Sequence, residues 1–265
     1  SRSPSSSLLT LRVTAPTITF GSLSSPPPMP SKIILSPRRI TGFLAALIVL
    51  LTLASLAGQY STYFLGYGWV FGMVPKFYLG KEGNVPSWYQ SVTLLLASAL
   101  LALIAVAKRQ HHDPFAPHWK WLAFIFLFLS LDEAASFHEL TIEPIQQTLH
   151  TSGLLYWAWI IPGMAFALVV FLLYLRFLAH LPTRTRWQFL AAGAIYIAGA
   201  VGVESFEARY AELHGYENWP SAVLIHFEEF GEMFGILLFL YALLSFLESH
   251  VGPLELSFTD SPRSS

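Results

Sequence analysis

The sequence contains no cysteine among its 265 residues. Disulfide bonds, thiolate metal sites and cysteine nucleophiles are therefore excluded. A metal ion in this protein would have to be held by His, Asp and Glu side chains. That ligand set favours hard or borderline cations over soft ones.

Charged residues are scarce as well. They make up 12% of the chain, whereas 54% of it is hydrophobic, and an ordinary soluble domain is about 25% charged. This imbalance indicates a membrane protein. The formal net charge of −1 gives no indication of a nucleic-acid partner. The sequence also lacks an internal repeat, a P-loop, a GxSxG motif, the Rossmann glycines and a histidine-box cluster.

Acidic residues are missing from the whole N-terminal part, and the first is Glu82. Residues 1–39 are rich in Ser and Pro and carry Arg, which is a pattern found in organelle transit peptides. The alternative is that Met29 is the true start, which would leave 1–28 upstream of the protein. We favour this alternative because 1–28 lacks an amphipathic, Arg-rich pattern. Either interpretation predicts a disordered tail over 1–39, and the composition of 249–265 predicts another.

Long apolar runs fill the region between these tails. A membrane-spanning helix needs about 20 mainly apolar residues, and six stretches come close to that length. They are 40–58, 90–107, 119–138, 154–178, 187–207 and 221–247. The sequence thus predicts an all-α integral membrane protein, with a six-helix transmembrane domain over 40–248.

Lys and Arg residues are distributed unevenly between the connecting segments. If the N-terminus is inside, twelve of them fall on the inner side and only three, Lys76, Lys81 and Arg209, on the outer side. This bias predicts that both termini are cytoplasmic. The long outer loop 59–90 is rich in Tyr and Trp, so it is either a folded cap over the outer mouth or a simple aromatic belt.

Acidic residues show the opposite distribution. Twelve of the sixteen fall on the predicted outer side. They cluster at the ends of the third and fifth spans and at the start of the sixth, so three helices bring carboxylates to one membrane level. Each buried acid carries its own energetic cost, and such residues commonly have a function.

Helical spacing selects candidates within these groups. At about 100° per residue, Asp132 and Glu139 would lie about 20° apart on one face of the third span. Residues three or four apart also share a face, as in the pairs Glu204 with Glu207, His226 with Glu229, and Glu228 with Glu232. The candidate metal ligands are Asp132, Glu139, Glu204, Glu207, His226, Glu229 and Glu232. The secondary candidates are Glu133, His138, Glu228 and Arg209.

Several carboxylates at close range repel one another, and a divalent cation would relieve that repulsion. We therefore expect one metal ion or a two-metal centre, of Fe, Mn or Zn. Helical two-metal sites usually carry a Glu-x-x-His motif, which this sequence lacks. The alternatives are a metal-free cluster that binds a cation or passes protons, and solvated charges at helix ends.

Two runs carry a resemblance to known sequences, namely EGNVPSWYQS over 82–91 and FLSLDEAASFHE over 128–139. They resemble a loosely defined group of uncharacterised bacterial multipass membrane proteins, over roughly residues 60–250. The resemblance implies a bacterial inner-membrane location. It brings no known activity and assigns no functional residue.

Three functions are compatible with these observations. The first is a metal-dependent membrane enzyme that acts on a lipid or another apolar substrate from the outer leaflet. The second is a cation- or proton-coupled transporter that uses the same carboxylates, although it lacks the internal repeat of many transporters. The third is a structural membrane subunit without a site. In each case the lipid bilayer is the surrounding partner, and a homodimer is an option that the small size leaves open.

Overall fold

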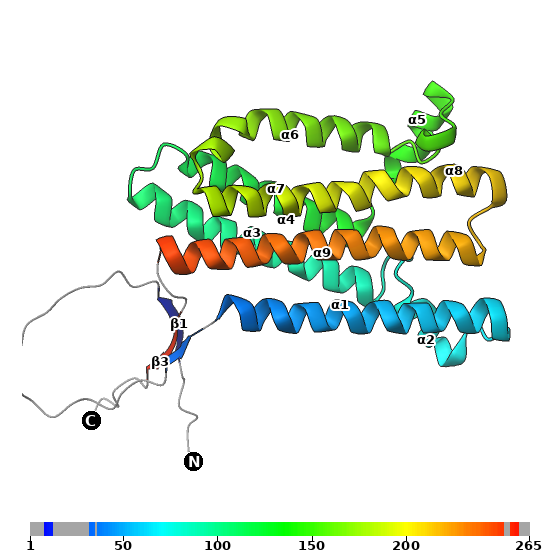
Figure 1. Cartoon of the computed structure of the whole chain (residues 1–265), viewed down its shortest axis with the longest axis horizontal. Helices are drawn as coiled ribbons and strands as arrows, with labels where there is room; N and C mark the ends of the chain where they lie inside the picture. Colours follow the sequence, from blue (N-terminus) through cyan, green and yellow to red (C-terminus); the bar gives the residue numbers. More distant parts are fainter. Residues whose placement is uncertain (1–7, 13–31, 35, 252–254, 260–265) are drawn as a thin grey trace, which may run out of the picture.

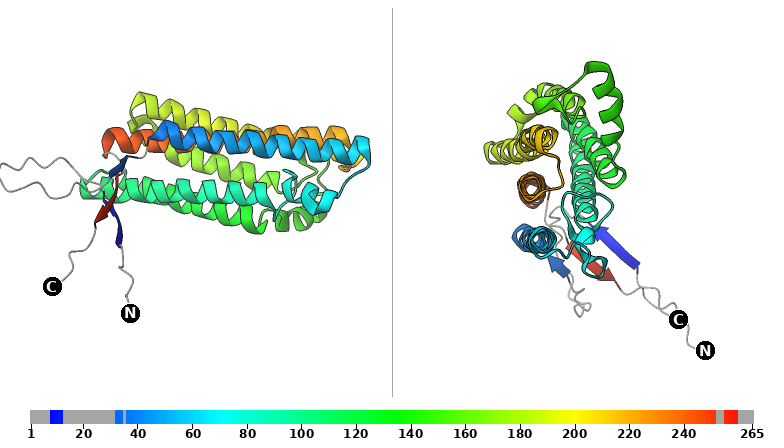
Figure 2. Two further views of the ribbon diagram at one scale, coloured as in Figure 1. Left: turned by 90° about the horizontal axis from the view of Figure 1, so that it is seen from below. Right: turned by 90° about the vertical axis from the view of Figure 1, so that its right-hand side faces the viewer.

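The computed structural model describes residues 8–12, 32–34, 36–251 and 255–259. Long helices run side by side along the long axis of the molecule (Figures 1 and 2). They are α1 (Pro37–Tyr60), α3 (Val85–Gln110), α4 (Ala116–Ala135), α6 (Ile160–His180), α7 (Thr183–Ile197), α8 (Glu204–His214) and α9 (Trp219–His250). The short helices are η1 (Ser61–Leu65), η2 (Val70–Gly72), α2 (Met73–Phe77), η3 (Glu139–Thr141), α5 (Ile142–Leu149), η4 (Gly153–Leu155) and η5 (Ala198–Val203).

Five of these helical stretches are long and apolar enough to cross a membrane. They are Pro37–Leu65, Val85–Gln110, Ile160–His180, Thr183–His214 and Trp219–His250. A sixth consists of α4 and the Glu139–Leu149 segment, which are bent by 76° relative to each other. The expectation of an all-helical bundle with about six spans is confirmed at this level. In Figure 1 the start of α1 and the end of α9 lie at the same end of the bundle.

A small antiparallel sheet accompanies the bundle. Its strands β1 (Leu8–Arg12), β2 (Lys32–Ile34) and β3 (Glu255–Thr259) are arranged in the order β1-β3-β2. Disorder was predicted for both tails, with Met29 as the start of the protein. Apart from the strands and the residues next to the bundle, these predictions concern 1–7, 13–31, 35, 252–254 and 260–265, which lie outside the described residues.

The loop predicted over 59–90 is largely helical. The helix α1 continues to Tyr60, and η1, η2 and α2 follow before α3 begins. The loop is tied to the bundle because the Leu79 amide donates to Ser55 Oγ of α1 at 3.0 Å. Its tip is apolar, and Phe71 is 98% exposed.

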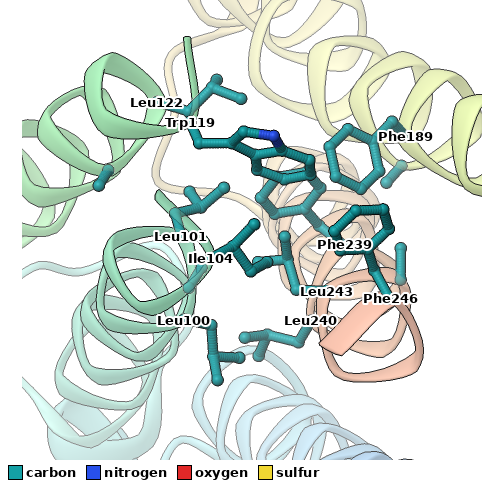
Figure 3. Close-up of a cluster of buried hydrophobic side chains, with 14 of the residues drawn as sticks. Leu100, Leu101, Ile104, Trp119, Leu122, Phe189, Phe239, Leu240, Leu243 and Phe246 are labelled. Atoms are coloured by element: carbon teal, nitrogen blue, oxygen red, sulfur yellow. The ribbon is translucent and has the colours of Figure 1, made fainter. Parts of the chain in front are cut away.

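Aromatic packing forms the core of the half of the bundle where α9 ends (Figure 3). Trp119 of α4 is 1% exposed, and its ring centroid lies 4.9 Å from that of Phe246 and 5.9 Å from that of Phe189. Leu101 and Leu243 fill the remaining space and are fully buried. Such aromatic pairs add stabilisation beyond the apolar area that they bury. The hydrophobic contacts fix this half of the bundle, and the polar groups gather in the other half.

Glycines allow α9 to approach the continuous helix α7–η5. A Cβ atom on Gly235 would lie 2.8 Å from the backbone nitrogen of Tyr196, and one on Gly199 would lie 2.8 Å from the carbonyl oxygen of Glu228. Both contacts involve backbone atoms that cannot move aside. The helices can therefore pack this closely only because both positions lack a side chain.

Gly235→Ala is expected to destabilise the protein by about 1–3 kcal/mol, because the added methyl group overpacks a rigid helix contact. The matched control is Gly193→Ala in α7, where a Cβ atom would meet nothing within 4 Å. The control should be neutral or up to about 1 kcal/mol more stable, through its higher helix propensity. Thermal unfolding in detergent measures both, and equal unfolding temperatures for the two variants would contradict this packing.

Candidate functional site

The helix α4 ends earlier than the sequence predicted. The third span was expected to continue to residue 138, with Asp132 and Glu139 on one face. Instead the helix stops at Ala135, because Ser136 adopts the left-handed conformation (φ 53°) and its amide donates to the Asp132 carbonyl. The following segment turns away by 76°. The shared face of Asp132 and Glu139 was therefore a wrong prediction.

This break places His138 against the end of α4. The Asp132 carboxylate accepts from the His138 backbone amide at 2.8 Å and pairs with ring atom Nδ1 at 3.0 Å. Since an ionised carboxylate can only accept, Nδ1 carries the proton in this pair. The other ring nitrogen, Nε2, lies 3.7 Å from Glu82 Oε1, which is longer than a hydrogen bond.

Glu82 is held in place by the start of α3. Asn84 caps that helix by accepting from the Ser87 amide at 3.2 Å, and its own side-chain amide donates to the Tyr78 carbonyl at 2.6 Å. These bonds fix the chain on both sides of Glu82. Burial raises the pKa of the Glu82 carboxyl to about 7, although the charge of His138 partly opposes this shift.

A candidate metal centre results from this arrangement. Within the described parts of the chain, Glu82, His138 and Glu139 form the one group of three acidic or His residues whose ligand atoms all lie within 4.8 Å of one another. Glu139 is exposed, while Glu82 and His138 are half-buried. One imidazole and two carboxylates suit Zn²⁺, Mn²⁺ or Fe²⁺.

A second polar group lies inside the bundle between α3, α4 and α9. The Gln90 side-chain nitrogen donates to Glu232 at 2.7 Å and to Glu133 at 3.3 Å. Gln90 is only 2% exposed, and its carbonyl oxygen has no hydrogen-bond partner among the residues that the structure describes. One amide therefore links carboxylates from two helices and retains a free acceptor beside them.

Two carboxylates of α8 each accept a hydrogen bond from the segment that leads into α6. The Trp159 indole donates to Glu204 at 2.6 Å, and the Trp157 indole donates to Glu207 at 3.2 Å. Glu207 also accepts from the Ser221 hydroxyl at 3.4 Å. The Trp159 ring lies 4.9 Å from that of His138, between centroids, so this group borders the candidate metal centre.

The remaining candidates lie around these groups. Glu229 is close enough to Glu232, Glu133, Glu204 and Glu82 for their charges to interact. The carboxylates of the third, fifth and sixth spans thus converge at one end of the bundle, where α2, α5 and α8 lie in Figure 1.

The other predicted residues differ in their surroundings. Glu228 is near Glu204, Glu229, Glu232 and Glu207. His226 is buried and uses Nδ1 to bond the Ala222 carbonyl at 2.6 Å. Its Nε2 atom has no partner within the described residues. Arg209 is exposed and lies near Gly153.

Comparison with known proteins places the chain in a family. A family model described as a domain of unknown function, DUF8692, matches residues 41–246. The chain belongs to this family. The match covers the predicted spans, apart from residue 40 of the first and residue 247 of the last, and every residue of the groups above. Comparisons with curated proteins and with solved structures gave no match.

Sequence reasoning missed four residues of these groups. Glu82 and Gln90 both lie in the quoted run EGNVPSWYQS, where an acid and an amide flank a helix cap. Trp157 and Trp159 look like apolar residues of a span, but each carries an indole N–H that must find an acceptor when it is buried. These donors could have been recognised in the sequence, because they fall at the same predicted membrane level as the acidic residues.

Trp159→Phe is expected to lower the stability by about 1–3 kcal/mol, because it leaves the buried Glu204 carboxylate without its donor. Trp88→Phe is the matched control, since Trp88 is 67% exposed. Thermal unfolding of both variants measures the difference. In the double variant Trp159→Phe/Glu204→Leu part of the lost stability should return, and a purely additive double variant would contradict the proposed bond.

Proposed function

We propose that this protein is a metal-dependent membrane enzyme that binds a divalent cation through Glu82, His138 and Glu139 and acts on a lipid or another apolar substrate. The observation that carries the proposal is the orientation of His138. Its Nδ1 atom is engaged by Asp132, and its Nε2 atom is turned towards Glu82.

A carboxylate that holds the second nitrogen of a His ligand is a recurrent feature of metal sites. It fixes the tautomer and the ring orientation and makes the ligating nitrogen more basic. Asp132 would serve in this way, as a positioning residue and not as a ligand. The alternative is that His138 is a protonated partner of Asp132 and Glu82, without a metal ion.

Three protein ligands leave a coordination position for water or substrate. Catalytic zinc sites have this composition, whereas structural sites are closed by four protein ligands. A metal ion in such a position activates a bound water or polarises a substrate oxygen. The exposure of Glu139 would leave this position accessible from the surface.

The surroundings of the ligands favour an apolar substrate. Phe137 is 45% exposed and Leu140 is 71% exposed, and they flank His138 and Glu139 in the chain. Apolar side chains beside a site at the end of a membrane bundle provide contacts for acyl chains. The distribution of Lys and Arg favours cytoplasmic termini, and we therefore propose that the site faces the outer side of the membrane. A bacterial inner membrane is proposed from the sequence resemblance.

The test is metal binding by purified protein that has been stripped with a chelator. Titration with Zn²⁺ or Mn²⁺ should give about one equivalent bound. His138→Gln should weaken binding at least tenfold because it removes a ligand, and Asp132→Asn should weaken it about 10- to 100-fold through the orientation of the ring. Calorimetry and elemental analysis measure the affinity and the stoichiometry.

His150→Gln is the matched control, because His150 is exposed and is not one of the three ligands. It should bind metal like the wild type. Wild-type protein that takes up no Zn²⁺, Mn²⁺ or Fe²⁺ would contradict the proposal. Equal affinities for His138→Gln and the control would do so too.

Cation- or proton-coupled transport is the second candidate, and the Gln90 network is the observation that favours it. Two carboxylates and a free amide oxygen inside a membrane bundle form an all-oxygen environment, which hard cations prefer. A half-turn of the amide would direct the carbonyl oxygen of Gln90 towards Glu133 and Glu232.

Flux measurements in proteoliposomes separate the two candidates. Under the transport hypothesis, Glu232→Gln abolishes a cation- or pH-driven flux, while His138→Gln leaves it intact, because the carboxylate network and not the surface triad carries the cation. Under the enzyme hypothesis neither variant alters the flux, because the wild type shows none above empty vesicles.

A further inference from the structure

A groove lies between α1 and α9, near the start of α1 and far from the acidic groups. It has a volume of about 260 Å³ and is lined by Arg38, Gly42 and Ala45 of α1 and by Leu237, Leu238 and Tyr241 of α9. Thr41 also borders it, but the Thr41 hydroxyl is already donated to the Pro37 carbonyl at 2.8 Å.

The two ends of this groove differ in chemistry. At one end the groove is lined by Arg38 and Tyr241, whose guanidinium and hydroxyl groups lie close together, and Arg184 adds a further positive charge nearby. The rest of the wall is formed by Ala45, Leu237 and Leu238, which are apolar. None of the lining residues is acidic. The groove therefore combines a cationic end with an apolar wall.

The predicted position of the groove in the membrane fits its cationic end and its apolar wall. Arg38 lies in the first turn of α1, at the edge of a membrane-spanning helix, where lipid phosphates are located. Ala45 lies two turns further along the helix, towards the hydrocarbon region. The space beside Gly42 is open, because a Cβ atom there would meet nothing within 4 Å.

We propose that this groove is a binding site for an anionic phospholipid. The phosphate would contact Arg38 and Tyr241, and an acyl chain would lie along Ala45, Leu237 and Leu238. Basic pockets between membrane helices bind anionic headgroups through this combination of charge and apolar contact. The proposal is independent of the metal centre, which lies at the other end of the bundle (Figure 1).

The experiment compares lipid retention by the full chain in mixed micelles that contain equal fractions of phosphatidylglycerol and phosphatidylcholine. Native mass spectrometry counts the bound lipids. The wild type should retain phosphatidylglycerol preferentially. Arg38→Gln should lower its affinity for phosphatidylglycerol about fivefold, the contribution of one basic residue near an anionic surface. Gly42→Leu should abolish retention by filling the groove.

Arg39→Gln is the matched control. Arg39 is the neighbouring exposed arginine in the same helical turn, but it does not line the groove. It should retain phosphatidylglycerol like the wild type, and millimolar inorganic phosphate should not displace the lipid. Equal retention of the two lipids by the wild type would overturn the proposal. An equal loss in Arg38→Gln and Arg39→Gln would also overturn it, as would displacement by free phosphate.

Discussion

A carboxylate that leaves water for the interior of a membrane bundle must find a hydrogen-bond donor or a cation, because leaving it unpaired is costly. This requirement accounts for the polar end of the bundle. Gln90 reaches the acids of α4 and α9. Trp157 and Trp159 reach those of α8. The helix that carries Gln90 and the segment before α6 are thereby linked to the acid-bearing helices at this end.

Some buried oxygen atoms at this end have no hydrogen-bond donor within the part of the chain that the structure describes. One oxygen of Glu204 and the carbonyl oxygen of Gln90 are buried there without a partner. Buried acceptors of this kind call for a proton, a water molecule or a cation. The excess of acceptors over donors is what distinguishes this end from a purely structural polar contact. It is the common basis of the enzyme and the transport hypotheses.

The break at Ser136 has the largest consequence for the candidate metal centre. A continuous helix would carry His138 away from Asp132 and would separate Glu139 from the loop that holds Glu82. The left-handed turn folds His138 back instead, and Asp132 then orients its ring. Because of this turn, the candidate ligands do not lie along one face of a single helix. They form a compact group in which Glu82 comes from one segment and His138 and Glu139 come from another.

Much of the architecture could be predicted from the sequence. The apolar runs located the spans, and the separation of acidic from basic residues located the polar end. The break could not be predicted, because Ser136 is neither Gly nor Pro and the helical pattern continues through it. The partners of the acids were also hidden, because Gln90, Trp157 and Trp159 are separated from them in the sequence by between 43 and 142 residues.

X-ray absorption spectroscopy of the zinc-loaded protein tests the proposed metal centre most directly. Zinc held by Glu82, His138 and Glu139 should show a first shell of one imidazole nitrogen and carboxylate or water oxygens, at about 2.0–2.2 Å. In Glu82→Gln an oxygen of this shell should be lost or replaced, while the imidazole contribution persists. A shell without imidazole, or a spectrum unchanged by Glu82→Gln, would contradict the assignment of Glu82, His138 and Glu139 as the metal centre.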